Sequence, residues 1–508
     1  MKHTTASRLC AAILAMLMLP LAACSADTPN DTKPDNTVES TTVVTAESDT
    51  TPAETDRSEA KDNLPADLKL NGETITILAR NASSILNYDV VGTDNTGDLV
   101  FDAVWERNER VKERLNADLL IIPSRSTSLN DLKKEMQTVV MSGSGDYDLF
   151  ITTNNSIIQF GMVAYLRVLN NAPHLDFDAP WWWTESMQNV ALDGETIQYL
   201  IGDMLPNNIL RASAVYVNKD IWQNNFGDPE QIYKLVEDGK WTLDAFAEYS
   251  KKVFKDVNGD GKADQGDTVG FYGNEVGTIS YLTMGADIFL SERDTNGYVT
   301  LKAPSDRSAS FTEKLINLFY NENAAMIAKS SDESQMIPAF VENRCLFLPS
   351  PLLSATDTRM REMKSDYAII PIPKYNEEQD NYRTLLSEAS TNASIPITVS
   401  DKKLISVCAV LEALCSESYR SVTEKFYETA LKGKYSRDSA SARMMDLILA
   451  CGRKELATEY AAKLNNIHKI YHYAISEKNM VIASYFEARV GKAQANLDEL
   501  IAELKKIK

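Results

Sequence analysis

Histidine and cysteine, on which metal and nucleophilic chemistry most often depends, are scarce in this chain, since its 508 residues include 4 histidines and 6 cysteines. Three motifs with a known mechanism are also absent: Gly-x-Ser-x-Gly, Gly-x-x-x-x-Gly-Lys-Ser/Thr and His-Glu-x-x-His. The sequence therefore carries no motif for a serine hydrolase of the elbow type, a P-loop nucleotide-binding protein or a zinc protease.

One histidine pair has a spacing that suits zinc: His468 and His472 lie four residues apart and would share a helix face. Lys469 stands where a zinc protease has its catalytic glutamate, and no third ligand is marked. We interpret the two as a surface histidine pair. Carboxylates are abundant, and their separation in space cannot be read from a sequence, so a glycoside hydrolase with a pair of acids stays open as an alternative.

Positive charge is scarce as well. Lysine and arginine number 52 against 72 aspartates and glutamates, and the formal net charge is −20. Contacts to phosphates need clustered lysine and arginine, so nucleic acid is excluded as the expected partner. The residues from Pro65 onward suffice for two domains with substantial cores.

Four cysteines lie in the body of the chain, at Cys345, Cys408, Cys415 and Cys451. In a helix, Cys408 and Cys415 would be about 10.5 Å apart along the axis. That separation is too large for a disulfide bond between them. We expect the cysteines to be small buried apolar residues and not a disulfide framework.

Long apolar runs are missing apart from a short one at the start. The basic residues Lys2 and Arg8 precede an apolar run over 10–19, and Leu21-Ala-Ala-Cys24 follows. This order predicts a secretory signal peptide over residues 1–23 and not a membrane-spanning helix. A cysteine directly after Leu-Ala-Ala resembles the lipobox of bacterial lipoproteins, which implies a diacylglycerol on Cys24 and a lipid anchor on the extracytoplasmic face of the membrane. The alternative is an ordinary cleaved signal that ends in a cysteine.

The stretch after Cys24 is acidic. Residues 25–64 contain ten acids, three bases and no aromatic side chain. Such a segment buries too little apolar surface to offset its ordering entropy, so we predict a disordered tether over residues 24–65.

The rest of the chain alternates between strand and helix patterns. Strands are predicted at 73–79, 118–122 and 148–153, with apolar stripes of helical spacing over 101–115 and 132–141 between them. This β-α-β-α-β order predicts an α/β lobe with a mostly parallel sheet. Later segments repeat the pattern, with strands at 212–217, 268–272, 345–348 and 366–370. The part from Lys402 is largely helical and ends in an amphipathic helix near 488–505.

One motif has the spacing of a calcium site. In the segment 256–267, oxygen-bearing residues stand at positions 1, 3, 5, 9 and 12 of an EF-hand-type loop, with Gly261 at position 6 and a backbone carbonyl at position 7. The predicted ligands are Asp256, Asn258, Asp260, Lys262, Asp264 and Asp267. The flanks are not a clear helix pair, so we predict a structural Ca²⁺ loop and not a sensor; a solvated acidic turn is the alternative.

Three of the 6 tryptophans are consecutive, at Trp181, Trp182 and Trp183, directly after Pro180. Neighbouring residues cannot all face one core, so we expect two to be buried and at least one to face a cleft or solvent. Indole rings stack on sugar faces, and their N–H groups donate to hydroxyls.

Several stretches resemble the extracellular solute-binding proteins of ABC importers, in the large family that takes up sugars and oligosaccharides. Gly145-Asp-Tyr-Asp-Leu-Phe-Ile with Asn154-Asn155 resembles the first-lobe strand and its ligand-facing loop. Tyr216-Val-Asn-Lys-Asp220 resembles the Tyr-Asn-Lys-Asp signature after the first hinge crossing. Ala339-Phe-Val-Glu-Asn343 and Lys434-Tyr-Ser-Arg-Asp438 resemble two later segments, with Asn343 in place of the usual glycine.

The resemblance implies a two-lobe periplasmic-binding-protein-like fold, each lobe a mostly parallel sheet flanked by helices. Lobe one would be residues 66–208 plus 390–434, and lobe two 209–389 plus 435–508. Three hinge crossings are expected near 206–211, 386–391 and 432–438.

The same resemblance implies a ligand in the cleft between the lobes. Asn154, Asn155 and Arg211 are carried over from matching stretches, while Trp182, Tyr272, Asn274 and Tyr281 are chosen for their chemistry. The implied function is capture of a carbohydrate, most simply an oligosaccharide, by a monomer that delivers it to ABC permease subunits without catalysis. The alternatives are a lipid-anchored glycan hydrolase, a binding protein for a peptide or another polar solute, and a calcium-stabilised scaffold.

Overall fold

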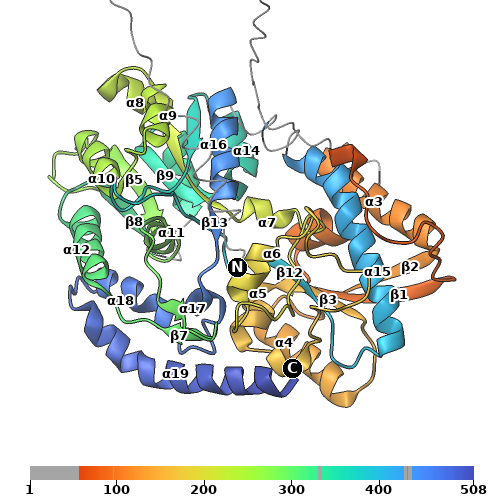
Figure 1. The fold of residues 1–508 in the computed structure, drawn as a ribbon. Helices are drawn as coiled ribbons and strands as arrows, with labels where there is room; N and C mark the ends of the chain where they lie inside the picture. Colours follow the sequence, from red (N-terminus) through yellow and green to blue (C-terminus); the bar gives the residue numbers. More distant parts are fainter. Residues whose placement is uncertain (1–56, 95–96, 330–333, 428–431, 433–437, 508) are drawn as a thin grey trace, which may run out of the picture.

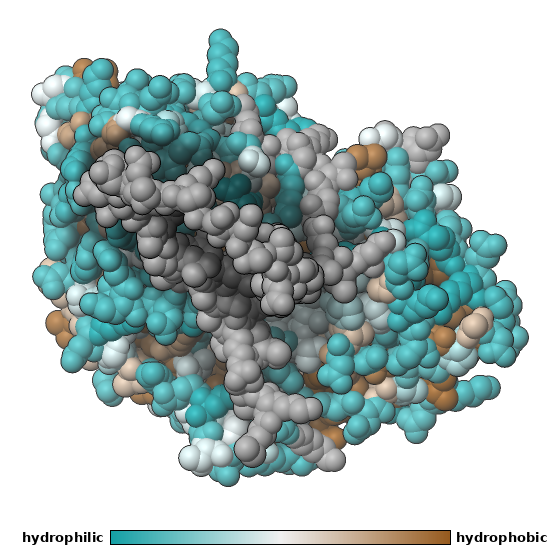
Figure 2. All heavy atoms as spheres, turned by 45° about the horizontal axis from the view of Figure 1, so that its top comes forward, coloured by the Kyte–Doolittle hydropathy of each residue, from teal (hydrophilic) through white to brown (hydrophobic). Residues whose placement is uncertain are grey.

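The computed structural model describes residues 57–94, 97–329, 334–427, 432 and 438–507. Two α/β lobes lie side by side (Figure 1). Hydrophilic residues predominate on the face in Figure 2, in keeping with the net charge of −20. In the described part of the chain, no helix is long and apolar enough to cross a membrane.

Lobe one is built on a four-stranded sheet with the order β12-β3-β1-β2. β1 pairs in parallel with β2 and with β3, and β12 returns antiparallel to β3. The predicted β-α-β-α-β order is confirmed. The elements are β1 (Glu73–Ala79), α3 (Leu99–Leu115), β2 (Ala117–Pro123), α4 (Leu129–Ser142), β3 (Leu149–Thr153), β12 (Thr391–Ser394) and α15 (Asp401–Glu417).

Side-chain alternation along β1 explains how this sheet is covered on both faces. Ile75 and Ile77 belong to the apolar cluster that includes Val407 of α15, whereas Leu78 belongs to the cluster that includes Met136 of α4. A mostly parallel sheet needs such burial on both sides.

Lobe two contains a five-stranded sheet with the order β10-β4-β9-β5-β8. β10 and β9 both pair antiparallel to β4, whereas β9-β5 and β5-β8 are parallel, so four of the five strands of this sheet run in the same direction and β4 is reversed. The expectation of a mostly parallel sheet is confirmed. The strands are β4 (Ser213–Asn218), β5 (Val269–Asn274), β8 (Ala325–Ala328), β9 (Cys345–Pro351) and β10 (Tyr367–Ile370). The helices of this lobe include α8 (Lys219–Phe226), α10 (Leu243–Lys252), α11 (Gly277–Gly285), α12 (Asp306–Tyr320), α13 (Met336–Val341) and α16 (Ser439–Ala450).

Two crossings between the lobes run side by side. The first contains α7 (Asn207–Leu210) and enters β4, and the second links β11 (Thr384–Leu385) to β12. An antiparallel bridge joins Ala212 to Leu386, and β13 (Gly452–Arg453) pairs with β11. The third predicted crossing falls largely on residues 433–437, outside the described residues.

The C-terminal segment contacts both lobes. It contains α17 (Leu456–Glu459), α18 (Ile470–Ser476) and α19 (Ile482–Ile507). α19 packs against α12 and α18 of lobe two and also against residues 163–165 of lobe one, and it extends beneath both lobes in Figure 1. Gly161 fits here because its φ is +64° and a Cβ would lie 2.6 Å from the side chain of Leu500. Residues 435–508 are therefore not confined to lobe two.

The chain is already folded before the predicted end of the tether. The carboxylate of Asp62 accepts two hydrogen bonds of 2.7 Å from the guanidinium of Arg114, and Ser416 donates to it at 2.8 Å. Residues 57–64, predicted as part of the tether, thus pack on lobe one.

The cysteine prediction is confirmed, because Cys345, Cys408, Cys415 and Cys451 are buried free thiols. The interpretation of a surface histidine pair is wrong. His472 is buried and its Nε2 lies 2.9 Å from the carbonyl oxygen of Val276. Burial lowers the pKa of His468 to about 3 and that of His472 to about 4, so both side chains are neutral in the folded protein at physiological pH.

Candidate ligand-binding site

Polar side chains gather where β1 and β3 of lobe one end. Arg80 directly follows β1, and its Nη1 donates to the hydroxyl of Thr153 at the end of β3 at 2.9 Å. The backbone N–H of Asn155 donates to the carbonyl of Glu388 in the second crossing at 2.9 Å. Parallel neighbours end at the same edge of a sheet, so these groups lie together at the edge nearest the crossings.

Arg211 in the first crossing extends this group toward lobe two. Burial lowers the pKa of Arg211, while the charges of Asp89 and Glu388 and the phenol of Tyr281 on α11 act in the opposite direction. These three groups therefore lie near the guanidinium. Burial also lowers the pKa of Arg80, and the positive charge of Arg211 lowers it further. We call Arg80, Asn155, Arg211, Tyr281 and Glu388 the hinge cluster.

Asn154 lies beneath the hinge cluster in a buried chain of polar groups. Its amide donates to Glu459 at 2.8 Å and accepts from Asn392 at 2.8 Å. Lys454 donates to Glu459 at 3.3 Å and to Ser390 at 3.0 Å. Asn154 is fully buried, so it positions the loop after β3 and offers no surface to a ligand in this conformation.

Lobe two gives mixed support to the remaining predicted residues. Tyr272 on β5 is buried in an apolar cluster. Asn274, at the end of β5, accepts backbone N–H bonds from Val276 and Gly277 and thereby shapes the turn into α11. Of the predicted ligand contacts, Asn155, Arg211 and Tyr281 come together, whereas Asn154, Trp182 and Tyr272 lie in the interior. Sequence reasoning missed Arg80 and Glu388, although Arg80 follows a predicted strand directly.

The three consecutive tryptophans divide as the sequence predicts, with two in the interior. Trp181 and Trp182 are 3% and 5% exposed, and their indole N–H groups donate to Glu412 at 3.0 and 2.9 Å. Trp183 is the more exposed ring and donates to Asp203 at 2.9 Å. Trp183 therefore replaces Trp182 as the accessible aromatic side chain.

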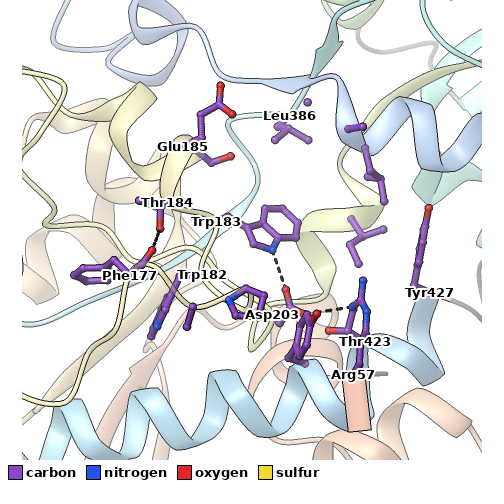
Figure 3. A pocket seen from close by; sticks show the side chains of 18 of the residues that line it. Arg57, Phe177, Trp182, Trp183, Thr184, Glu185, Asp203, Leu386, Thr423 and Tyr427 are labelled. Atoms are coloured by element: carbon purple, nitrogen blue, oxygen red, sulfur yellow. Dashed lines mark hydrogen bonds and ion pairs between the residues drawn. The ribbon is translucent and has the colours of Figure 1, made fainter. Parts of the chain in front are cut away.

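Trp183 borders a cavity of about 700 Å³ that both lobes line (Figure 3). Glu185 of lobe one and Arg453 of β13 form an ion pair at its wall, and Leu386 of the second crossing contributes apolar surface. No member of the hinge cluster lines this cavity. The hinge cluster and the cavity are thus two separate places at which lobe one meets lobe two.

The predicted calcium loop has the required oxygen atoms, but they are engaged within the loop. Asp256 accepts backbone N–H bonds from Gly259 and Gly261, and Asp267 accepts from Val257 and Asp264. Among the described residues, no group of three or more His, Cys, Asp or Glu side chains is arranged to hold a metal ion. The donor types fit Ca²⁺, and the calcium site stays a prediction.

No family model matches this chain, and no curated protein matches it in sequence. Solved structures do match. UgpB from Mycobacterium tuberculosis in complex with glycerophosphocholine has a TM-score of 0.53 and 13% identity, covering 85% of this chain and 100% of that chain. An ABC substrate-binding protein from Listeria monocytogenes in complex with cycloalternan has a TM-score of 0.52 and 11% identity, covering 85% and 99%. A cyclo/maltodextrin-binding protein complexed with maltotetraose has a TM-score of 0.51 and 10% identity, covering 86% and 97%. At these identities the likeness shows the fold, and it confirms the predicted two-lobe binding-protein architecture.

Proposed function

We propose that this protein is the substrate-binding component of an ABC import system and captures a carbohydrate, most simply an oligosaccharide, between its lobes. The observation that carries the proposal is the hinge cluster. Arg80 and Asn155 come from lobe one, Arg211 and Glu388 from the two crossings, and Tyr281 from lobe two. A ligand that contacts all of them bridges the lobes. The three similar solved structures named above all hold bound ligands, and two of them are named as binding proteins, which supports capture without catalysis.

The chemistry of the hinge cluster suits a polyhydroxylated ligand. The amide of Asn155 both donates and accepts, the guanidinium of Arg211 donates only, and the carboxylate of Glu388 accepts only, so neighbouring hydroxyl groups can be bound as donors and as acceptors. A ligand that contacts both lobes is bound more tightly by a closed conformation than by an open one. Binding would shift the population toward the closed form, which a permease can recognise.

The proposal is tested by a thermal-shift screen across oligosaccharides, peptides and polyols, followed by small-angle scattering with any hit. We expect a rise in Tm with an oligosaccharide and a smaller radius of gyration in its presence. Asn155→Ala should weaken binding several-fold, as loss of one or two hydrogen bonds does. Asn296→Ala, in the exposed turn between β6 (Ser291–Arg293) and β7 (Val299–Leu301), should leave binding unchanged. A screen without any carbohydrate hit, or turnover of a chromogenic glycoside, would contradict the proposal.

We also propose that the protein is exported and anchored by a diacylglycerol on Cys24, which lies outside the described residues. The described body begins at Arg57, so the 32 residues 25–56 separate it from Cys24. A flexible chain of that length spans about 30 Å. A monomer held at this distance would release its ligand close to permease subunits in the same membrane. The membrane contact is through the lipid only.

A further inference from the structure

Arg80 and Arg211 of the hinge cluster are incompletely paired. Among the residues that the structure describes, the Nε atoms of both are buried without a hydrogen-bond partner. Arg80 uses Nη1 on the hydroxyl of Thr153, and the side chain of Arg211 donates no hydrogen bond to any described residue. Within the described part of the chain, neither guanidinium lies within 4.0 Å of a carboxylate oxygen.

Most buried or half-buried arginines elsewhere in the molecule are well bonded. Arg107, which is 1% exposed, donates to two backbone carbonyls and to the side chains of Asn108 and Ser418. Arg114 binds Asp62 through two hydrogen bonds of 2.7 Å. Acids outnumber bases 72 to 52 in this chain, so two neighbouring arginines without an ion pair are unexpected unless an acceptor comes from outside.

The nearby acids do not supply this acceptor. Asp89 is fully buried, its Oδ1 accepts the backbone N–H of Asn207, and burial raises its pKa to about 7. Glu388 accepts from the hydroxyl of Ser387 at 3.3 Å. Asp89 and Glu388 therefore moderate the charge around Arg211 without binding its guanidinium directly.

Resting on the proposed function, we propose that the captured saccharide is acidic and that Arg80 and Arg211 bind its oxyanion. Guanidinium groups pair with carboxylates and phosphates through two parallel hydrogen bonds, and these charge-assisted bonds are about twice as strong as neutral ones. A neutral sugar enclosed at the same place would leave two desolvated positive charges uncompensated, which is costly. The oxyanion is the carboxylate of a uronic acid or the phosphate of a sugar ester, since both present the same acceptor geometry.

The position of the two arginines adds a reason for closure. Arg80 is fixed to the end of β3 through its hydrogen bond to Thr153. Arg211 lies in the first crossing, and its backbone carbonyl accepts the backbone N–H of Ser387 in the second crossing at 3.3 Å. An anion between them removes their mutual repulsion. Binding would therefore stabilise the relative position of lobe one and the two crossings as well as contact the sugar.

The test is isothermal titration of the full soluble chain with three classes of probe: neutral oligosaccharides such as maltotriose, uronate oligomers such as trigalacturonate, and glucose 6-phosphate. We expect a probe with an oxyanion to bind at least 10-fold more tightly than its neutral counterpart. Arg211→Gln and Arg80→Gln should each weaken binding of the acidic probes by a larger factor than binding of neutral sugars, and so remove most of that preference, because a glutamine amide still donates to hydroxyls but carries no charge. Arg211→Lys should recover only part of it, because an ammonium cannot form the paired bonds. Arg125→Gln, at a side chain that is 89% exposed, is the matched control and should change nothing.

The outcomes separate the two proposals. Equal affinity for neutral and acidic probes, or a preference for acidic probes that survives both glutamine variants, would overturn the acidic ligand and leave carbohydrate capture intact. No binding of any saccharide would overturn carbohydrate capture itself. A preference for trigalacturonate over glucose 6-phosphate, or the reverse, identifies the source of the oxyanion. Melting temperatures of the variants within 2 °C of the parent, on the order of the change that 1 kcal/mol causes in a large domain, show that lost binding is not lost folding.

Discussion

The buried ion pair between Lys454 and Glu459 allows a sharp prediction, because its two partners differ in how easily each becomes neutral. Both side chains are 1% exposed and 3.3 Å apart, and Glu459 also accepts from Asn154 of lobe one. Removing one partner leaves the other buried without a counter-charge, and such a group neutralises itself where it can. Glu459→Gln and Lys454→Met therefore destabilise the protein to different degrees and with different pH dependence.

The magnitudes follow from the ordinary pKa values. A lysine has an ordinary pKa of about 10.4, and one pH unit corresponds to about 1.36 kcal/mol. A buried lysine left without its counter-charge can become neutral by releasing its proton, so at pH 7 the free energy of unfolding of Glu459→Gln falls by at most about 5 kcal/mol. The ordinary pKa of Glu459 is 4.5, and burial already raises it. In Lys454→Met, Glu459 can become neutral by taking up a proton, so the free energy of unfolding falls by at most about 3.4 kcal/mol at pH 7 and by less than about 1 kcal/mol at pH 5.

Urea denaturation of both variants at pH 5 and pH 7 measures these free energies of unfolding. Relative to the parent chain, Lys454→Met should be most stable below pH 4.5 and lose stability as the pH rises toward 7, because the raised pKa favours the protonated folded state. Glu459→Gln should be the less stable variant at both pH values. Equal losses in the two variants, or a Lys454→Met variant insensitive to pH, would refute the argument.

Three further predictions concern other parts of the molecule. Burial raises the pKa of Glu412, which accepts from Trp181 and Trp182, to about 7, so its contribution to the free energy of unfolding is full below pH 4.5 and falls by about 3 kcal/mol toward pH 7. Between pH 4.5 and pH 8 the melting temperature of Glu412→Gln should therefore fall less steeply than that of the parent chain. An equal fall in the two proteins would contradict this prediction. Calorimetric titration should detect Ca²⁺ binding to the loop 256–267 and lose it in Asp260→Ala; no heat and no rise in Tm with Ca²⁺ would exclude the site. Cys24→Ala should abolish lipid labelling and membrane association while ligand binding persists; lost binding would contradict the separation of tether from binding body.

The sequence predicted local elements well and tertiary partners poorly. β1 has the predicted bounds because a β-branched run follows the Asn71-Gly72 turn, and both signals are local. The direction of β4 is not encoded in its composition, so its reversal within the mostly parallel sheet of lobe two was not predicted. The same limit applies to the site. Glu459 lies 305 residues from Asn154, and only the folded chain reveals their contact.

A net charge of −20 and an acidic ligand are compatible because the two effects act over different distances. At physiological ionic strength, charges are screened beyond about 8 Å, so the acidic surface repels the ligand weakly during approach. Arg80 and Arg211 act at contact, where burial reduces screening and increases the strength of charge-assisted bonds. Long-range charge mainly sets the association rate, and desolvated contacts mainly set the dissociation rate. Added salt should therefore accelerate both association and dissociation, with opposing effects on affinity. Salt dependence of the equilibrium constant alone thus understates the contribution of the arginines, and rate measurements on Arg211→Gln isolate it.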